Sequence, residues 1–158
     1  MKKIWNTNNA PAPVGPYNQA IEVNGILYCS GQIAIDPTTG NLVTDNIEAE
    51  THQVMKNIQA ILENAGLGFE NIIKASVFVK DMNLYGRINA VYAEYFNEDT
   101  APARELVEVA NLPKFVNVEI SVLGTRYSGT RCWELGAGCW VLDAEHRVLC
   151  FGYCVDNQ

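Results

Sequence analysis

Hydrophobic residues recur along this chain at two different spacings, and these spacings predict its strands and helices. A spacing of two residues is typical of a strand with one buried face, and one of three to four is typical of a helix. The first spacing predicts strands over residues 19–23, 26–35, 71–80, 101–110 and 118–122, and the second predicts helices over residues 46–65 and 82–96.

The expected order of elements is ββαβαββ, which indicates an α+β domain. Both helices can cover one face of a mixed sheet, and the other face is then left without a covering layer. The strand at residues 71–80 carries apolar residues on both of its faces, with Ile73 expected on the face of Ala75, Val77 and Val79 and Ile72 on the other. We therefore expect the second face of the sheet to be covered by oligomerisation.

Glycine-containing sequences mark the first two strands. Asn24-Gly25 predicts a type I′ hairpin between them and is the strongest turn signal in the chain. Ser30-Gly31 interrupts the returning strand. A glycine in that position indicates a β-bulge, a close approach of a ligand to the backbone, or packing beneath a helix. The sequence leaves these alternatives open.

The last two expected strands are joined by a short proline-containing loop, and we expect them to form a strand pair. They carry two charged side chains that suit chemistry. Alternation places Arg104, Leu106 and Glu108 on one face of the first strand. In the second strand it places Glu119 opposite the apolar residues. A strand arginine after a proline turn is a fixed fork that suits a carboxylate or a phosphate. Spacing alone favours the alternative, which is a solvated charge on an edge strand.

Length and charge exclude several classes of protein. The 158 residues suit one domain with a substantial core. The net charge of −7 and the lack of a basic run argue against a dedicated nucleic-acid binder. No apolar segment approaches the length of a transmembrane helix, and the N-terminus lacks the apolar run of a signal peptide. We therefore expect a cytoplasmic protein without a membrane partner.

The cysteines are unevenly distributed. Cys29 is the only one in the first 126 residues, and within an apolar strand it is expected to be a small buried hydrophobe. The last 32 residues hold the other four, Cys132, Cys139, Cys150 and Cys154. These raise the possibility of a zinc site or of two disulfides. They include no CxxC pair and match structural zinc spacing poorly, so we expect no metal.

Several ordered motifs resemble those of one known family. They are Ala10-Pro-Ala-Pro-Val-Gly-Pro-Tyr-Asn-Gln-Ala, Tyr28-Cys-Ser-Gly-Gln-Ile, Thr51-His-Gln-Val-Met-Lys-Asn-Ile, Asn89-Ala-Val-Tyr-Ala-Glu-Tyr-Phe and Ala101-Pro-Ala-Arg, followed by Leu112-Pro and Val118-Glu-Ile. In this order they resemble the Rid (YjgF-type) family of reactive intermediate/imine deaminases, and within it the archetypal RidA-like subgroup. The resemblance covers roughly residues 1–125.

The resemblance implies a chorismate-mutase-like fold, a homotrimer, and ligand sites in the clefts between subunits. It also implies hydrolysis of 2-imino acids, derived from 2-aminoacrylate or 2-aminocrotonate, to 2-keto acids and ammonia, with no cofactor. Arg104 matches the arginine that grips the substrate carboxylate, and Glu119 matches the acid that holds or activates the attacking water. Tyr17, Ser30 and Gly31 match residues of the pocket.

Two features depart from the family pattern. Many members have a small residue and then cysteine after the arginine, whereas this chain has Glu105 and Leu106. Leu106 is expected to line the pocket and leaves the range of substrates open. The family domain is expected to span residues 1–126, so residues 127–158 form an atypical C-terminal extension. That extension is either a small β-hairpin turning at residues 143–146 or a non-native appendage, and we expect no catalytic function from it.

Two alternative functions remain. One is an endoribonuclease acting on single-stranded RNA, an activity attributed to some relatives. The acidic charge and the lack of a histidine pair for acid–base work count against it. The other is a non-catalytic chaperone or small-ligand-binding trimer, which would bind keto acids without turning over imines.

Overall fold

The computed structural model describes residues 1–126, 140–142 and 148–150. The chain divides into two compact units, Met1–Ser128 and Gly129–Gln158. Within the described residues, no helix is both long enough and apolar enough to cross a membrane.

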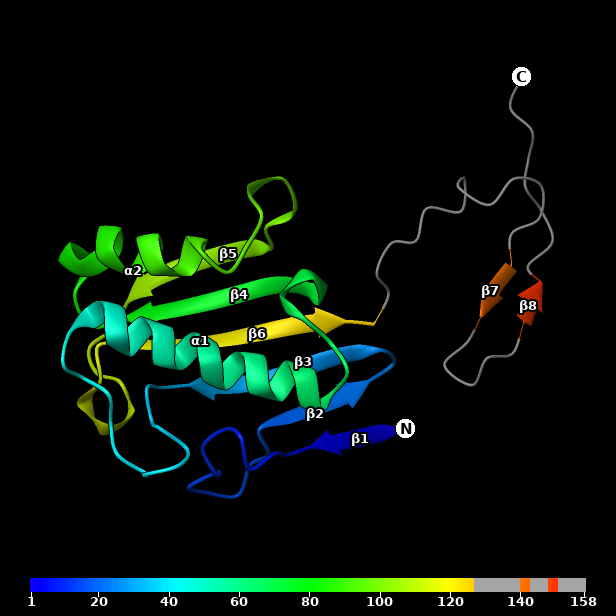
Figure 1. The fold of residues 1–158 in the computed structure, drawn as a ribbon, viewed down its shortest axis with the longest axis horizontal. Coiled ribbons are helices and arrows are strands. Elements are labelled where there is room, and N and C mark those ends of the chain that lie inside the picture. Colours follow the sequence, from blue (N-terminus) through cyan, green and yellow to red (C-terminus); the bar gives the residue numbers. More distant parts are fainter. Residues whose placement is uncertain (127–139, 143–147, 151–158) are drawn as a thin grey trace. The chain divides into compact units, whose positions relative to one another are not determined.

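A six-stranded mixed sheet forms the body of the first unit (Figure 1). From edge to edge its order is β1-β2-β3-β6-β4-β5. Neighbouring strands run antiparallel except β4 and β5, which are parallel. The strands are β1 (Lys2–Trp5), β2 (Ala20–Val23), β3 (Ile26–Gln32), β4 (Ile72–Val79), β5 (Ala103–Glu108) and β6 (Val118–Thr125).

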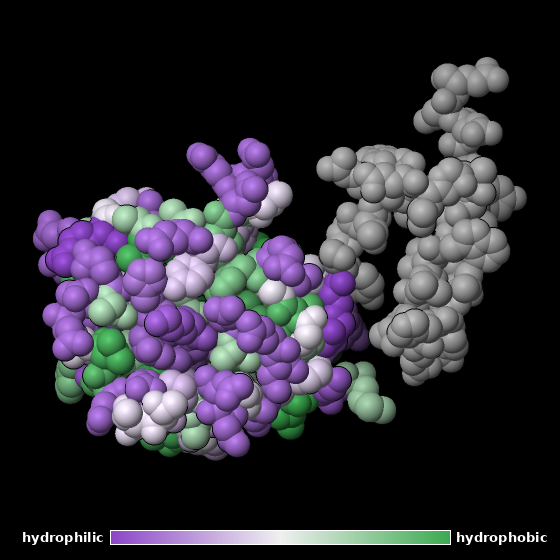
Figure 2. Space-filling model, viewed as in Figure 1, coloured by the Kyte–Doolittle hydropathy of each residue, from purple (hydrophilic) through white to green (hydrophobic). Residues whose placement is uncertain are grey.

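Two α-helices, α1 (Ile47–Asn64) and α2 (Tyr85–Ala93), lie on the same face of this sheet (Figure 1). The face of the molecule that carries them is mostly hydrophilic, as expected of an outer layer (Figure 2). Four short 3-10 helices occur in the connections, η1 (Phe69–Asn71), η2 (Met82–Leu84), η3 (Glu98–Thr100) and η4 (Pro113–Phe115). The predicted α+β class, with a mixed sheet and both helices on one face, is confirmed. The homotrimer stays a prediction.

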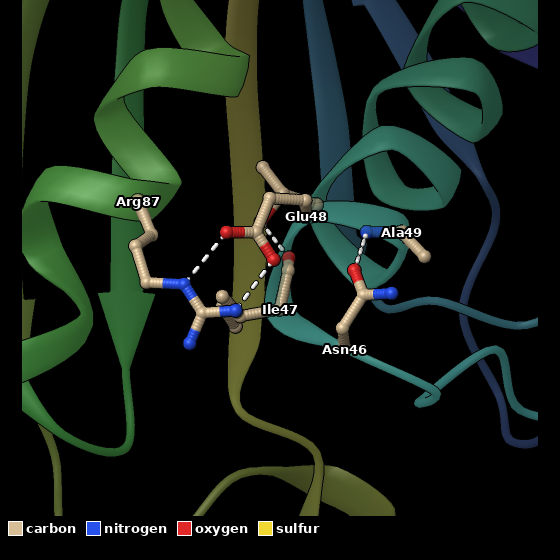
Figure 3. A network of polar contacts seen from close by, with 6 residues as sticks. Asn46, Ile47, Glu48, Ala49 and Arg87 are labelled. Carbon is tan, nitrogen blue, oxygen red and sulfur yellow. Dashed lines mark hydrogen bonds and ion pairs between the residues drawn. The ribbon is translucent and has the colours of Figure 1, made fainter.

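Local signals explain where α1 begins and ends. The side chain of Asn46 accepts a hydrogen bond of 2.8 Å from the backbone N–H of Ala49, which caps the first turn (Figure 3). Glu48, in the same turn, pairs with Arg87 of α2 at 2.6 Å (Figure 3). The helix stops before Gly66, which has a φ of +69°. This left-handed conformation makes glycine the favoured residue just after a helix.

The hydrophobic core lies between the helices and the sheet. β6 is central to it because it pairs with both β3 and β4. Alternate residues of β6 and β4 point to the helices and are almost completely buried, namely Val118, Ile120, Val122, Ala75, Val77 and Val79. The opposite face of β6 therefore carries Glu119 and Ser121, as the alternation predicts.

The structure differs from the sequence-based expectation at three places. β1 was not expected, because its sequence, Lys2-Lys-Ile-Trp, shows no apolar alternation. In the structure Lys2 and Lys3 are exposed. The strands at residues 103–108 and 118–125 do not lie side by side, since β4 separates them. A register shift between Ile72 and Lys74 reverses the expected orientation of two residues: Ile72 is buried and Ile73 is exposed.

The hairpin of residues 24–25 has the predicted geometry. Asn24 and Gly25 both have positive φ, 53° and 76°, as a type I′ turn requires.

The second unit contains two described strands, β7 (Trp140–Leu142) and β8 (Val148–Cys150), which pair antiparallel. The turn predicted at residues 143–146 lies outside the described residues. Cys132, Cys139 and Cys154, on which the zinc and disulfide alternatives depend, lie outside them as well.

Candidate active site

A cavity of about 580 Å³ opens where the N-terminal loop (the proline-rich segment of residues 6–19 between β1 and β2), β3 and the start of β6 meet. Four of the predicted site residues, Tyr17, Ser30, Gly31 and Glu119, line it together. Most of the remaining lining is apolar, which suits a small ligand oriented by a few polar groups. The full lining is Pro11, Ala12, Val14, Gly15, Tyr17, Gln19, Ser30, Gly31, Gln32, Ile33, Ile35, Pro113, Lys114 and Glu119.

Gly31 lies at a break in the β3–β6 ladder. Cys29 pairs with Val122 and Gln32 pairs with Ile120, so two residues of β3 face one residue of β6. A β carbon at Gly31 would overlap the carboxylate of Glu119. Of the alternatives that the sequence left open, the glycine therefore marks both a bulge and a close approach, here of a protein carboxylate to the backbone.

The side chain of Glu119 lines the cavity and is half-buried. Desolvation by burial raises the pKa of its carboxyl group above the ordinary value. A carboxylate with a raised pKa accepts a proton from water more readily than an exposed one does. The raised pKa makes Glu119 a candidate general base.

Ser30 and Tyr17 use their hydroxyl groups to fix the local backbone. The hydroxyl of Ser30 donates to the carbonyl of Asn18 at 2.7 Å, and its backbone N–H donates to the carbonyl of Gln19 at 2.9 Å. The hydroxyl of Tyr17 accepts from the backbone N–H of Val14 at 3.3 Å. The Tyr17 side chain is half exposed at the cavity wall, so its ring is accessible to a ligand.

Gln19 is a site residue that sequence reasoning missed, although it stands within the first motif. Its side chain is 2% exposed and bonds only to backbone groups of the proline-rich loop. The amide nitrogen donates to the carbonyls of Thr7, Ala10 and Pro11 at 2.9, 3.1 and 2.9 Å. The amide oxygen accepts from the N–H of Thr7 at 2.6 Å. Gln19 therefore holds the loop that forms one wall of the cavity.

Lys114, also missed, approaches the cavity from η4. Lys114 and the adjacent Phe115 both have positive φ, 57° and 58°. Each such non-glycine residue costs about 1 kcal/mol or more. Among the described lining residues Lys114 is the only cation.

Arg104 lies elsewhere, at the edge strand β5. It pairs in register with Ala75, which is fully buried, so its side chain lies on the face that the helices cover. One guanidinium nitrogen donates to Oδ1 of Asn89 at 2.8 Å, and the group stacks over the ring of Tyr92 at 4.8 Å. This packing fixes the fork in place, unlike a freely solvated edge charge.

Arg104 and Glu119 are therefore on opposite faces of the sheet within one chain. Glu119 pairs with Phe78 of β4, and Phe78 pairs in turn with Val107 of β5, on the face without helices. Leu106 shares the face of Arg104, pairs with Val77 and packs against the core. The cavity of the single chain is not lined by either Arg104 or Leu106.

Other potential reactive groups lie apart from this chemistry. Cys29 is buried, as predicted, and desolvation raises the pKa of its thiol to about 12. It therefore remains a neutral thiol. Within the described ranges, no three His, Cys, Asp or Glu side chains are grouped so as to hold a metal ion.

The fold and the cavity together define a class of small α+β proteins with a mostly apolar cavity beside a half-buried carboxylate. The family described as "Endoribonuclease L-PSP" matches residues 7–125. The chain belongs to this family, which is also known as the Rid, YjgF or RutC family.

Relatives at high identity cover the same region. A RutC family protein of Synechocystis is 56% identical over 119 residues, which are 75% of this chain and 92% of the relative. The 2-iminobutanoate/2-iminopropanoate deaminase of Salmonella typhimurium is 44% identical over 128 residues, 80% of this chain and 99% of the relative. The crystal structure of a Rid family protein of unknown function from Yersinia pestis is similar with a TM-score of 0.77 at 48% identity. It covers 79% of this chain and 99% of that one.

Proposed function

We propose that this chain hydrolyses reactive 2-imino acids to 2-keto acids and ammonia, as a 2-iminobutanoate/2-iminopropanoate deaminase. The observation that carries the proposal is the half-buried Glu119 carboxylate, with its raised pKa, held against Gly31 in a mostly apolar cavity. The 44% identity to a Salmonella protein named for this activity supports it.

Glu119 acts on the water in this mechanism. It accepts a proton as the water oxygen attacks the carbon of the protonated imine, which gives a carbinolamine. That proton then passes to the carbinolamine nitrogen. As the C–N bond breaks and ammonia leaves, the carbinolamine hydroxyl gives its proton back to Glu119 and becomes the carbonyl, and this proton ends on the released ammonia. A protonated imine is already electrophilic, so orienting water and substrate supplies much of the acceleration. No cofactor takes part.

Arg104 binds the substrate carboxylate through its fixed fork. Because Arg104 and Glu119 lie on opposite faces of one chain, the proposed site is completed by a second copy, in a homotrimer with sites between subunits. The face of the sheet opposite the helices supports this assembly. It exposes Ile4, Tyr28 and Val107, which are 53%, 43% and 41% exposed, and such a surface favours burial against another subunit. In such an assembly Leu106 lies near the substrate, because it is on the same face of β5 as Arg104, which binds the substrate carboxylate.

Arg104→Ala tests the clamp. We expect the variant to lose about 100-fold or more in kcat/KM, because the substrate is no longer oriented. The assay follows ammonia release from 2-iminobutanoate and 2-iminopropanoate generated in place by an amino acid oxidase. Arg87→Ala is the matched control, since it removes the same charge from the exposed pair with Glu48 and should leave the rate unchanged.

The outcomes separate the parts of the proposal. Retained activity in Arg104→Ala would contradict the carboxylate clamp, and absence of turnover in the wild-type chain would contradict the function itself. Running the full chain beside a chain ending at Arg126 tests the extension, for which we expect equal rates.

The endoribonuclease alternative rests on the description of the family that the chain matches. The net charge of −7 counts against binding of a phosphate backbone. Cleavage of single-stranded RNA by highly purified protein, abolished by Glu119→Gln, would favour it. Binding of keto acids without imine turnover would favour the non-catalytic trimer.

A further inference from the structure

A fully buried carboxyl group bonds to the strand end that leads to Glu119. Glu50, in the first turns of α1, is 0% exposed and does not line the cavity. Removing a carboxylate from water is costly unless hydrogen bonds replace its hydration. The residue that donates these hydrogen bonds therefore indicates the role of Glu50.

Both oxygens of Glu50 bond to a single residue of the polypeptide, Asn117. Oε1 accepts from the backbone N–H of Asn117 at 2.6 Å, and Oε2 accepts from its side-chain amide at 2.8 Å. Asn117 presents two donors, and a carboxylate matches them because both of its oxygens accept. A glutamine at position 50 would offer one accepting oxygen and one donating amide group. The carbonyl of Asn117 in turn accepts from the N–H of Lys80 at 2.9 Å. Asn117 is thus fixed from α1 on one side and from the end of β4 on the other.

Asn117 joins the two parts of the cavity wall that carry charge. Glu119 follows it by two residues along β6. Before it come Lys114 and Phe115, both held in the left-handed conformation. Unfavourable backbone conformations persist only where the surroundings determine them. The pairing with Glu50 fixes Asn117, which lies between the left-handed loop and Glu119.

We propose that Glu50 is a positioning residue, which acts through Asn117 to hold Glu119 and the Lys114 loop in place for catalysis. This inference rests on the imine hydrolase function proposed above. Glu50 has no contact with substrate. Its role is to fix the direction from which the Glu119 carboxylate meets the water.

The test exchanges donor and acceptor across the pair. Asn117→Asp places a second carboxylate against Glu50, so the two repel and the side-chain bond is lost. Adding Glu50→Gln restores it, because the glutamine amide donates to the new carboxylate while its oxygen still accepts from the backbone N–H of residue 117. We expect Asn117→Asp to lower kcat by about 10- to 100-fold, with a smaller change in KM, and the double variant to recover most of the rate.

Two further measurements distinguish positioning from a general loss of structure. In a Glu119→Gln background, Asn117→Asp should cost little additional rate, since both changes disable the same group. The titration of the Glu119 carboxyl group, followed by ¹³C NMR, should move in Asn117→Asp and return in the double variant. The double variant carries the same net charge at this pair as the wild type. Asn117→Ala, which removes the side-chain bond without adding charge, therefore separates loss of the bond from an effect of charge, and it should also lower kcat. The control is Glu48→Gln, which lies in the same helical turn but pairs with Arg87 (Figure 3), and it should leave rate and titration unchanged.

The outcomes are decisive. Equal losses in the presence and absence of Glu119, or no recovery in the double variant, overturn the positioning role. If Asn117→Asp does not fold, Asn117→Ala replaces it, because this change removes one bond and adds no charge; the same lack of additivity is expected at smaller size. If the wild-type chain shows no imine turnover, the proposed function fails, whereas the NMR titration still confirms or refutes the coupling of Glu50 to Glu119.

Discussion

At Gly31 the backbone of β3 passes so close to the Glu119 carboxylate that a β carbon does not fit between them. Gly31→Ala is therefore expected to displace the carboxylate and to reduce kcat about 100-fold. The measurement is the imine hydrolysis rate of the folded variant, with folding checked by circular dichroism. A rate near that of the wild type would mean that the position of Glu119 is not critical.

Gly86 provides the matched control for that substitution. It lies in α2, where an added β carbon meets no atom within 4 Å. Gly86→Ala should leave the rate unchanged and stabilise the protein by about 0.5–1 kcal/mol, as replacement of a helical glycine by alanine does.

The motifs in the sequence were sufficient to select Tyr17, Ser30, Gly31 and Glu119, which the structure gathers in one cavity. They were not sufficient for Gln19 or Glu50. The role of Gln19 depends on the path of the N-terminal loop, which brings three carbonyl groups to one side chain. The role of Glu50 depends on a contact with a residue 67 positions away. Residue spacing carries no signal for either.

At the scale of elements, periodicity predicted both helices and all the strands of the first unit except β1. It did not predict the order of the strands within the sheet. The alternation correctly assigned Arg104 to one face and Glu119 to the face opposite the apolar residues of its own strand. It could not show that β4 inserts between β5 and β6, because strand order depends on packing over the whole sheet.

Arg126 joins four elements at the end of β6. Its guanidinium donates to Glu22 of β2 at 2.7 and 3.0 Å and to the carbonyl of Ala65 after α1 at 2.6 Å. It also lies over the ring of Trp5 in β1, 5.6 Å from its centroid. Because the pair is partly exposed, we expect Arg126→Ala to cost about 1–2 kcal/mol in free energy of unfolding.

The pH dependence of that cost has a defined sign. The hydrogen bond from Arg126 lowers the pKa of the Glu22 carboxyl group below its ordinary value of 4.5. The contribution of Glu22 is therefore present above that value and is lost as the pH falls through the lowered pKa. Urea unfolding at about pH 7 and about pH 3, at constant protein concentration, should show a smaller difference between wild type and variant at the acid pH. An undiminished difference at the acid pH would contradict this account.

For the whole molecule, the opposite placement of Arg104 and Glu119 predicts complementation. Arg104→Ala and Glu119→Gln should each keep only a small residual rate alone, about 1% of the wild type or less. If each site takes its arginine and its acid from different copies, randomly mixed trimers regain both residues in about a quarter of their sites. Refolding the two variants together and measuring imine hydrolysis tests this. Mixtures as inactive as the separate variants would place the whole site within one chain.

The way in which Gln19 anchors the N-terminal loop determines which residues of the cavity wall can be substituted. It holds the N-terminal loop only through backbone groups, which are the same whatever side chains the loop carries. Ala12 and Val14 line the cavity on that loop and are not needed to anchor it. The side chains at these two positions of the cavity wall can therefore change while the loop keeps its path. Under the proposed function, selectivity among imino acids can diverge there without a cost to the core, and a mutant library at positions 12 and 14 would test this.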